Sequence, residues 1–208
     1  MSKLDGFPSL PSVGPMIVVI SGPSGVGKTV ICQRLIDMDS SLVHSRSATT
    51  RKPRPHETDG EDYFFWGEDQ FREAVDAGFF LEWAEVHGNL YGTPQGPIEK
   101  HLEVGKSPVL DVDVQGGRSV KQARPDAVLI LVAPPSLGAL EDRLRGRGTD
   151  SEEIVRQRLA NAARELAQWE HYDYVLINDV LDEAVADARA MIVAERARVV
   201  RRRRSPNP

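Results

Sequence analysis

The chain has 208 residues, of which 40% are hydrophobic and 27% are charged, and its formal net charge is −5. These values suit one soluble α/β domain with room for a small inserted unit, and the negative charge argues against general nucleic-acid binding. No apolar run approaches the roughly 20 residues of a membrane span, and the N-terminus lacks the apolar centre of a secretory signal. A single cysteine, Cys32, excludes an internal disulfide framework, so we expect a reducing, cytoplasmic setting.

The opening of the chain predicts an irregular arm followed by a strand and a helix. Residues 1–15 carry three prolines, two glycines and three serines, which is typical of a mobile arm. The apolar run at 16–20 is too short for a helix and indicates a strand buried on both faces, as in a parallel sheet. A helix over 27–38 and a possible strand over 42–49 follow.

The rest of the chain alternates predicted strands with predicted helices. The polar stretch 51–62 predicts a loop that leads into the aromatic residues 63–65. The later elements are predicted in this order: a helix (68–77), a strand (79–86), a turn (87–89), a helix (97–104), two strands (109–114, 127–132), two helices (137–144, 151–169), a strand (174–177) and a helix (181–200). This alternation implies an α/β fold with a parallel central sheet, and the short strand-like pieces near 47–93 indicate a small β-rich insert.

A phosphate-binding loop lies between the first predicted strand and the first predicted helix. Its spacing, G-x-x-x-x-G-K-[ST], is met by Gly22, Gly27, Lys28 and Thr29. The glycines allow several N–H groups to face one phosphate, Lys28 supplies a full charge, and the Thr29 hydroxyl can bind Mg²⁺. Nucleoside triphosphate binding is therefore predicted for Gly22, Pro23, Ser24, Gly25, Val26, Gly27, Lys28 and Thr29.

Two further stretches carry groups suited to a second ligand. Arg51 and Arg54 lie among hydroxyl residues, and guanidinium groups suit phosphate oxygens in two-point contacts. A solvated loop with a basic face explains these arginines equally well. Glu82 lies in an apolar run where an unpaired carboxylate is costly, so it needs either a ligand or a structural arginine as its donor.

The chain resembles the guanylate kinase family over about residues 16–195. The resemblance rests on several motifs that occur in the same order: G-P-S-G-V-G-K-T, S-A-T-T-R-K-P-R, F-L-E-W-A, G-N-L-Y-G-T, L-D-V-D-V-Q-G, R-G-T-D-S-E-E-I-V-R-Q-R-L and I-N-D. It implies a three-layer P-loop NTPase fold with a β-rich GMP-binding insert and a helical, arginine-rich lid. It also implies Mg²⁺-dependent phosphorylation of GMP, and of dGMP, by ATP in purine nucleotide metabolism.

The resemblance assigns the acceptor nucleotide to specific residues. The positions that match phosphate contacts are Ser47, Arg51, Arg54, Tyr63 and Tyr91, and those that match guanine contacts are Glu82, Thr93 and Asp113. A carboxylate can accept both donors on the N1 and N2 edge of guanine, whereas adenine presents a bare acceptor at N1. Asp111 and Asp113 are two residues apart on a predicted strand, so both should point to one face.

The resemblance also assigns the donor side and the lid. The residues that would act in catalysis are Lys28, Arg51, Arg147 and Arg158, and Asn178 would contact adenine. Thr29 would bind Mg²⁺ directly and Asp111 through water. Arg143 is a weaker candidate, and we interpret Arg145 and Arg156 as structural because Glu152 and Glu153 lie nearby as partners.

These motifs divide the chain into five parts: an N-terminal arm (1–15), a core (16–46, 94–136 and 171–200), a GMP-binding subdomain (47–93), a lid with flanking helices (137–170) and a basic tail (201–208). The run Arg201 to Arg204 is interpreted as a solvated tail on the last helix. The expected partners are ATP and GMP, without nucleic acid or membrane, and both monomer and homo-oligomer stay open.

The chain departs from the family pattern at three places, and two other functions stay open. Thr29 replaces the more usual serine of the phosphate loop but keeps the metal-binding hydroxyl. Val30 stands where a hydroxyl residue is frequent, which removes a possible α-phosphate contact, and Leu90 stands where an aromatic is common. One alternative is another nucleoside monophosphate kinase, which Glu82 disfavours. The other is a non-catalytic guanylate-kinase-like binding module, which the intact loop with Lys28 disfavours.

Overall fold

The computed structural model describes residues 13–55, 57–86, 88–146 and 151–201 of the chain. Within these residues the core is a five-stranded sheet in the order β2-β7-β1-β8-β9, and all its pairs are parallel. Its strands are β1 (Val18–Ser21), β2 (Leu42–His44), β7 (Ser107–Val112), β8 (Val128–Ala133) and β9 (Tyr174–Ile177). The predicted parallel central sheet is confirmed, and its middle strand, β1, leads directly into the Gly-rich loop.

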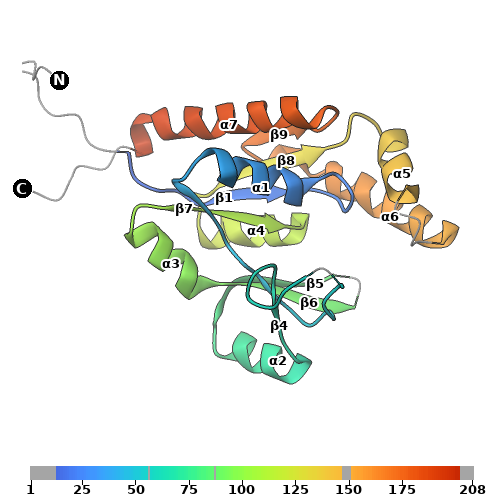
Figure 1. Ribbon diagram of the computed structural model, residues 1–208, viewed down its shortest axis with the longest axis horizontal. Helices are drawn as coiled ribbons and strands as arrows, with labels where there is room; N and C mark the ends of the chain where they lie inside the picture. Colours follow the sequence, from blue (N-terminus) through green and yellow to red (C-terminus); the bar gives the residue numbers. More distant parts are fainter. Residues whose placement is uncertain (1–12, 56, 87, 147–150, 202–208) are drawn as a thin grey trace, which may run out of the picture.

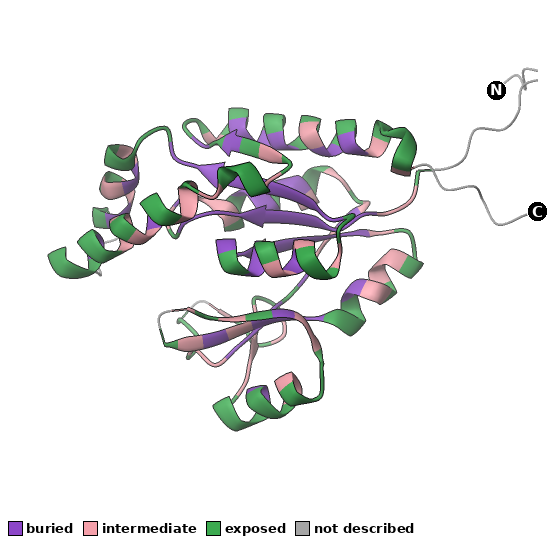
Figure 2. Ribbon diagram, turned by 180° about the vertical axis from the view of Figure 1, so that it is seen from behind, coloured by how far each residue is buried: buried purple, intermediate pink, exposed green. Residues whose placement is uncertain are grey.

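Helices cover both faces of this sheet, which gives the molecule three layers (Figure 1). The helices are α1 (Lys28–Met38) and α7 (Leu181–Ala197) on one face, and α3 (Gln95–Glu103) and α4 (Val114–Ala123) on the other. Successive strand residues point to opposite faces, so Ile20 packs with α1 and α7 whereas Val19 packs with α3 and α4. Figure 2 shows the buried central strands between helices whose outer faces are exposed.

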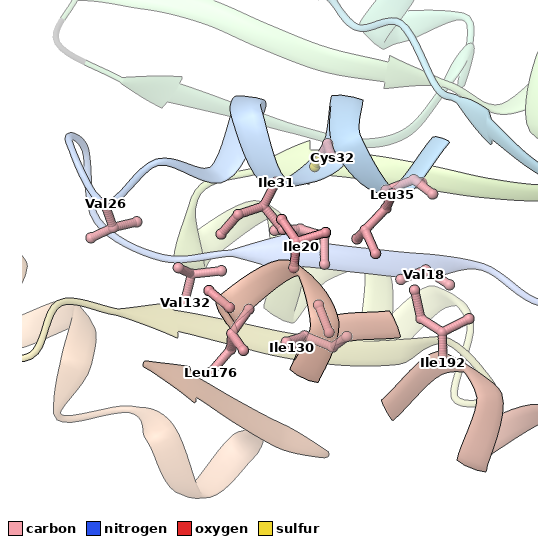
Figure 3. Close-up of a cluster of buried hydrophobic side chains, with 14 of the residues drawn as sticks. Val18, Ile20, Val26, Ile31, Cys32, Leu35, Ile130, Val132, Leu176 and Ile192 are labelled. Atoms are coloured by element: carbon pink, nitrogen blue, oxygen red, sulfur yellow. The ribbon is translucent and has the colours of Figure 1, made fainter. Parts of the chain in front are cut away.

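The Gly-rich loop is anchored in this core by Val26. Its side chain is fully buried in the cluster that also holds Leu140 and Leu144 of α5 (Leu137–Arg145) and Val155 of α6 (Glu152–Leu166). Figure 3 shows Val26 on the loop, near Val132 at the end of β8. The helices on either side of the expected lid therefore share a hydrophobic core with the loop.

A second, smaller sheet lies beyond α4, on the side away from α7 (Figure 1). Its order is β4-β3-β6-β5, with β3 (Ala48–Thr49), β4 (Phe64–Phe65), β5 (Phe80–Val86) and β6 (Asn89–Pro94). Helix α2 (Glu68–Asp76) packs on this sheet through aromatic residues, of which Phe71 and Phe80 stack with centroids 4.5 Å apart. Strand β5 lies beside α4, so the first turn of α4 separates the two sheets.

One expectation about an individual element is wrong, and two further elements were not expected. The single strand expected over 42–49 is two strands in different sheets, because the chain leaves the core after His44 and joins the small sheet at Ala48. Residues Asn89–Pro94 form β6, where only a turn at 87–89 was expected. Helix α4 was not expected, because adjacent glycines at its start disfavour a helix. Its first turn is instead stabilised by Asp113, whose Oδ1 accepts the N–H of Gly116 at 2.8 Å.

The C-terminal arginine run begins inside the folded structure. Arg201 ends a short 3₁₀ helix (Val199–Arg201), and its side chain is only 14% exposed. Its Nε donates to the buried Glu195 at 2.9 Å, its guanidinium also donates to the Asp126 carbonyl, and its own carbonyl accepts the N–H of Gly14. A solvated tail is therefore wrong for Arg201, whereas 202–208, like residues 1–12 of the expected arm, lie outside the described residues.

The remaining elements lie close to their predicted positions. The long helix expected over 151–169 is α6, which ends at Leu166, and a separate 3₁₀ helix follows (Trp169–His171). Cys32 is buried in α1, as expected of a small apolar side chain. Across the described part of the chain, no helix combines the length and apolarity that crossing a membrane requires.

Candidate active site

The Gly-rich loop joins β1 to α1 at the carboxyl edge of the central sheet. Gly22 and Gly27 have φ angles of 144° and 94°, which side-chain-bearing residues rarely adopt. At Gly22 an added Cβ would also lie 2.3 Å from the carbonyl oxygen of Val132. The loop N–H groups and the N-terminus of α1 can therefore approach an anion closely, as phosphate binding requires.

Lys28 begins α1, and its side chain folds back toward the loop. Its Nζ donates to the carbonyl of Gly22 at 2.7 Å and to that of Pro23 at 3.2 Å. The hydrogen-bond partners of this group among the described residues are thus neutral carbonyls. Its positive charge stays available for phosphate oxygens.

Asn178 supports the loop from the end of β9. It is 5% exposed, and its Nδ2 donates to the carbonyl of Val26 at 2.6 Å. An added Cβ at Gly27 would lie 2.6 Å from that same nitrogen, so the loop and the amide are in close contact. The carbonyl of Asn178 accepts from Arg143 of α5 at 2.8 Å, which links α5 to the base of the loop. These contacts give Asn178 a loop-supporting position, and its contact with adenine stays a prediction.

Thr29 and Asp111 form the oxygen pair beside Lys28. The Thr29 hydroxyl donates to Asp111 Oδ2 at 2.6 Å, and Asp111 lies near the end of β7, next to β1. No group of three or more acidic, histidine or cysteine side chains that could hold a metal occurs in the described ranges. A hydroxyl and a carboxylate suit Mg²⁺, which usually keeps several waters and takes few protein ligands. The residues present therefore fit Mg²⁺ that is shared with a nucleotide.

The two arginines of the insert are organised by one carboxylate. Arg51 makes two 2.9 Å hydrogen bonds to the two oxygens of Glu57, whose side chain is 7% exposed. The backbone N–H of Arg54 also donates to Glu57, at 2.8 Å, while the Arg54 side chain is 60% exposed. Burial alone would raise the pKa of Glu57, but the bonds from Arg51 and Arg54 lower it below its ordinary value. Of the two interpretations of this loop, an ordered basic site thus fits better than a solvated loop.

Two tyrosines complete this basic group. The Arg51 guanidinium carbon lies 5.5 Å from the Tyr63 ring centroid, and the Tyr63 and Tyr91 rings meet edge to face at 6.3 Å. Burial raises the pKa of Tyr63 to about 12, and the charge of Asp111 adds to this effect. Tyr63 therefore keeps its hydroxyl proton as a donor.

The predicted guanine-reading residues come together at the β5–β6 hairpin and the start of α4. Glu82 and Thr93 are opposite each other in the hairpin, and the Thr93 hydroxyl donates to Glu82 Oε1 at 2.5 Å. Ser47 shares a 3.4 Å hydrogen bond with Thr93. Burial, partly offset by the Thr93 hydrogen bond and helped by the nearby charge of Asp113, raises the pKa of Glu82 to about 7. Asp113 follows β7 as the N-cap of α4 rather than lying within the strand, so its capping Oδ1 leaves Oδ2 for a ligand.

The lid residues are only partly described. Arg147 lies outside the described residues, and Arg158 lies on α6. Arg145 pairs with Glu141 and Glu152, in keeping with the structural interpretation of that arginine. Val30, the departure in the loop, is 49% exposed on α1.

Sequence reasoning missed two supporting groups. Glu57, which binds both Arg51 and Arg54, was given no role, although its charge lies close to Arg51 in the sequence and was the signal that could have assigned it. Ser21, fully buried at the end of β1, donates to the carbonyl of Asp113 at 2.9 Å and shares a 2.9 Å hydrogen bond with the Tyr172 hydroxyl. A buried hydroxyl needs such partners, so Ser21 itself was a signal.

The sequence and the fold have clear relatives. A family model described as "Guanylate kinase" matches residues 15–195. The guanylate kinase of Symbiobacterium thermophilum is 47% identical over 186 residues, which are 89% of this chain and 88% of that protein. The guanylate kinase of Maricaulis maris is 43% identical over 201 residues, which are 95% and 92% of the two chains. The crystal structure of guanylate kinase from Anaplasma phagocytophilum matches with a TM-score of 0.76 and 33% identity, covering 92% of this chain and 91% of that chain. This chain therefore belongs to the guanylate kinase family of phosphate-transferring enzymes.

Proposed function

We propose that this kinase transfers the γ-phosphoryl group of ATP to GMP, and to dGMP, in the cytoplasm as a step of purine nucleotide metabolism. Family membership supports the reaction class. The observation that carries the choice of acceptor is the buried carboxylate of Glu82, whose Oε1 accepts from Thr93. The same base and phosphate occur in dGMP, so the proposal includes both acceptors.

The guanine selectivity follows from the hydrogen-bonding capacity of this carboxylate. Guanine N1–H and N2–H₂ are two donors on one edge, and Glu82 can accept from both when it is ionised. Adenine would present a lone pair to the same carboxylate and leave it buried without donors. Sites built on such base hydrogen bonds reject the wrong base strongly, because their own polar groups stay unpaired.

The transfer itself depends on positioning and on positive charge. The GMP phosphate is already an anionic nucleophile, so no dedicated base is needed, and in-line alignment of two phosphates is the main requirement. Arg51 and Arg54, ordered by Glu57, would hold the acceptor phosphate, with hydroxyl donors from Ser47, Tyr63 and Tyr91. Lys28 and the loop N–H groups would hold the β and γ phosphates of ATP. Arg147 and Arg158 would add charge at the transferring group.

The proposed reaction also uses Mg²⁺, which would bind beside ATP. Thr29 would bind the ion through its hydroxyl and Asp111 through water, in keeping with the 2.6 Å hydrogen bond between them. When bound, Mg²⁺ neutralises charge on the β and γ phosphates. The lid and the insert would exclude water around both nucleotides, since an open site would hydrolyse ATP.

The proposal is tested by an acceptor panel with ATP and Mg²⁺. We expect ADP formation with GMP and dGMP, and rates lower by at least about 100-fold with AMP, UMP and TMP, because each wrong base leaves buried groups unpaired. Glu82→Gln should lose most of its kcat/KM for GMP while the KM for ATP stays unchanged. Glu85→Gln, on the same strand but exposed, is the matched control. Comparable rates with AMP, or an equal loss for both substrates in Glu82→Gln, would refute the acceptor assignment.

A further inference from the structure

Two adjacent glycines, Gly116 and Gly117, lie in the first turn of α4 for a reason other than backbone geometry. Neither has a positive φ, and both are buried in a helix, where glycine is less favourable than alanine. The reason is therefore the space that a side chain would occupy. An added Cβ at Gly117 would meet Ser21 and Tyr172 on the core side, with the Ser21 Oγ at 3.2 Å.

Gly116 faces the opposite way, toward the small sheet. An added Cβ there would lie 2.9 Å from Oε2 of Glu82, closer than real Cβ atoms come to other heavy atoms. The first turn of α4 is thus a thin wall between the base of the Gly-rich loop and the carboxylate proposed to read guanine. Only a residue without a side chain allows Glu82 to approach this wall.

The Glu82 carboxylate has little room to move away from such a Cβ. Its other oxygen is held at 2.5 Å by Thr93, and the residue is 7% exposed. The added Cβ could not shift away from Glu82 either, because it would lie 3.1 Å from Val112 Cβ and 3.3 Å from Asp113 Oδ1. A methyl group at position 116 would therefore displace either Glu82 or Asp113, the two carboxylates assigned to the base.

We propose that Gly116 is a specificity-determining positioning residue, which sets the separation between Glu82 and Asp113 by leaving the space into which Glu82 Oε2 fits. It touches neither phosphate and takes no part in the transfer. Its effect is on the KM for the guanine nucleotide, because the edge of the base must meet both carboxylates in one geometry. This inference rests on the proposed role of Glu82 in reading guanine.

The kinetic test compares Gly116→Ala with Gly96→Ala. Gly96 lies in the first turn of α3, is exposed, and an added Cβ there would meet nothing within 4 Å. We expect Gly116→Ala to raise the KM for GMP about 10- to 100-fold with the KM for ATP unchanged, as misplacement of a binding group does. Gly96→Ala should leave both values unchanged. Equal rises in both KM values, or no change, in Gly116→Ala would overturn the inference.

A stability cycle tests the steric contact without relying on activity. In a Glu82→Ala background the 2.9 Å contact is gone while those with Val112 and Asp113 stay, so Gly116→Ala should lower Tm less there than in the wild-type background. Gly96→Ala, at an open position, should raise Tm by about 2 °C through helix propensity. An equal shift in both backgrounds would overturn the inference. If Glu82→Gln loses its kcat/KM for GMP while Gly116→Ala keeps the wild-type KM for GMP, only the inference about Gly116 fails. If Glu82→Gln still prefers GMP over AMP, the proposed function fails and the inference fails with it.

Discussion

The Thr93 hydroxyl donates a 2.5 Å hydrogen bond to Oε1 of Glu82 across the β5–β6 hairpin, and both side chains are buried. Such a carboxylate is poised between two states. Burial and the nearby Asp113 favour its protonated form, whereas the Thr93 bond and the donors of a guanine favour its ionised form. Ligand binding and proton release are therefore coupled at this residue.

The first prediction concerns the pH dependence of GMP binding. Because the pKa of Glu82 is about 7 in the free protein and GMP needs the carboxylate, only the ionised fraction binds GMP well. The KM for GMP should fall about tenfold between about pH 6 and about pH 8, with little change in the KM for ATP. The phosphate of GMP also titrates in this range, so Glu82→Gln is the reference for that smaller effect. An identical pH profile in both proteins would contradict this coupling.

The second prediction concerns stability in the absence of nucleotide. Folding raises the pKa of Glu82 from 4.5 to about 7, so its favourable contribution is complete below about pH 4.5 and is lost as pH rises through about 7. Glu82→Gln is neutral throughout. The free energy of unfolding of the variant relative to wild type should increase by about 2 kcal/mol from about pH 5 to about pH 8. Denaturant titrations at both pH values measure this, with Glu85→Gln as the control that should show no trend.

The third prediction concerns the ordering of Arg51 by Glu57. Removing one carboxylate oxygen in Glu57→Gln breaks the two-point contact and leaves the guanidinium less ordered. The KM for GMP should rise about tenfold while the KM for ATP is unchanged, because the acceptor phosphate loses a positioned contact. Glu61→Gln, an exposed neighbour in the same loop, is the control. A variant with unaltered GMP kinetics would mean that Glu57 orders the loop without serving the ligand.

The features predicted correctly from the sequence are those with local causes. The Gly-rich loop and its flanking strand and helix follow from spacing and periodicity within one short stretch. Helix α4 could not be predicted in this way, because Gly116 and Gly117 weaken its helical pattern. These glycines are there because they lie against Glu82 and Ser21, which are distant in sequence. The division of 42–49 between two sheets also depends on distant partners. Strand β2 pairs with β7 near residue 109, whereas β3 pairs with β6 near residue 92.

The site shows the same division between local and distant causes. Arg51, Arg54 and Glu82 could be proposed as binding groups from their residue types and their context. The family resemblance supplied Thr93 and Asp113. The 2.6 Å bond from Asn178 to the Val26 carbonyl joins residues 152 positions apart, and no local pattern marks it.

The fourth prediction separates two roles of Asn178. If its amide supports the loop, Asn178→Ala leaves the Val26 carbonyl without its donor, which costs about 1–3 kcal/mol of stability. The loop would then be less well ordered for any nucleotide, so the KM for ATP and the KM for CTP should both rise. If its main role is contact with adenine, only the KM for ATP should rise. We expect a rise of about tenfold for both donors with the KM for GMP unchanged. Asn161→Ala, on α6, is the amide control, and a purely ATP-specific effect would refute the supporting role.

The fifth prediction concerns the ion pairs that join the end of the chain to its core. Glu195 is 2% exposed on α7 and accepts from Arg201, Arg198 and Tyr174. Removing Arg201, whose side chain is 14% exposed, leaves a buried carboxylate with one strong donor fewer. Breaking a buried ion pair is strongly destabilising, but Arg198 and Tyr174 remain as donors and reduce the loss. Arg201→Ala should therefore lower the free energy of unfolding by about 2 kcal/mol.

Arg198→Ala provides the matched comparison for this effect. The Arg198 side chain is 55% exposed, so water can replace much of its contact and the loss should be below about 1 kcal/mol. Both variants should keep wild-type kcat and KM, because Glu195 lies in the last turn of α7 and its partners, Arg201, Arg198 and Tyr174, belong to neither the Gly-rich loop nor the small sheet. Denaturant unfolding with paired kinetic assays measures the difference. Equal losses in the two variants would show that burial of Arg201 adds nothing, and the contact would then be an ordinary surface ion pair.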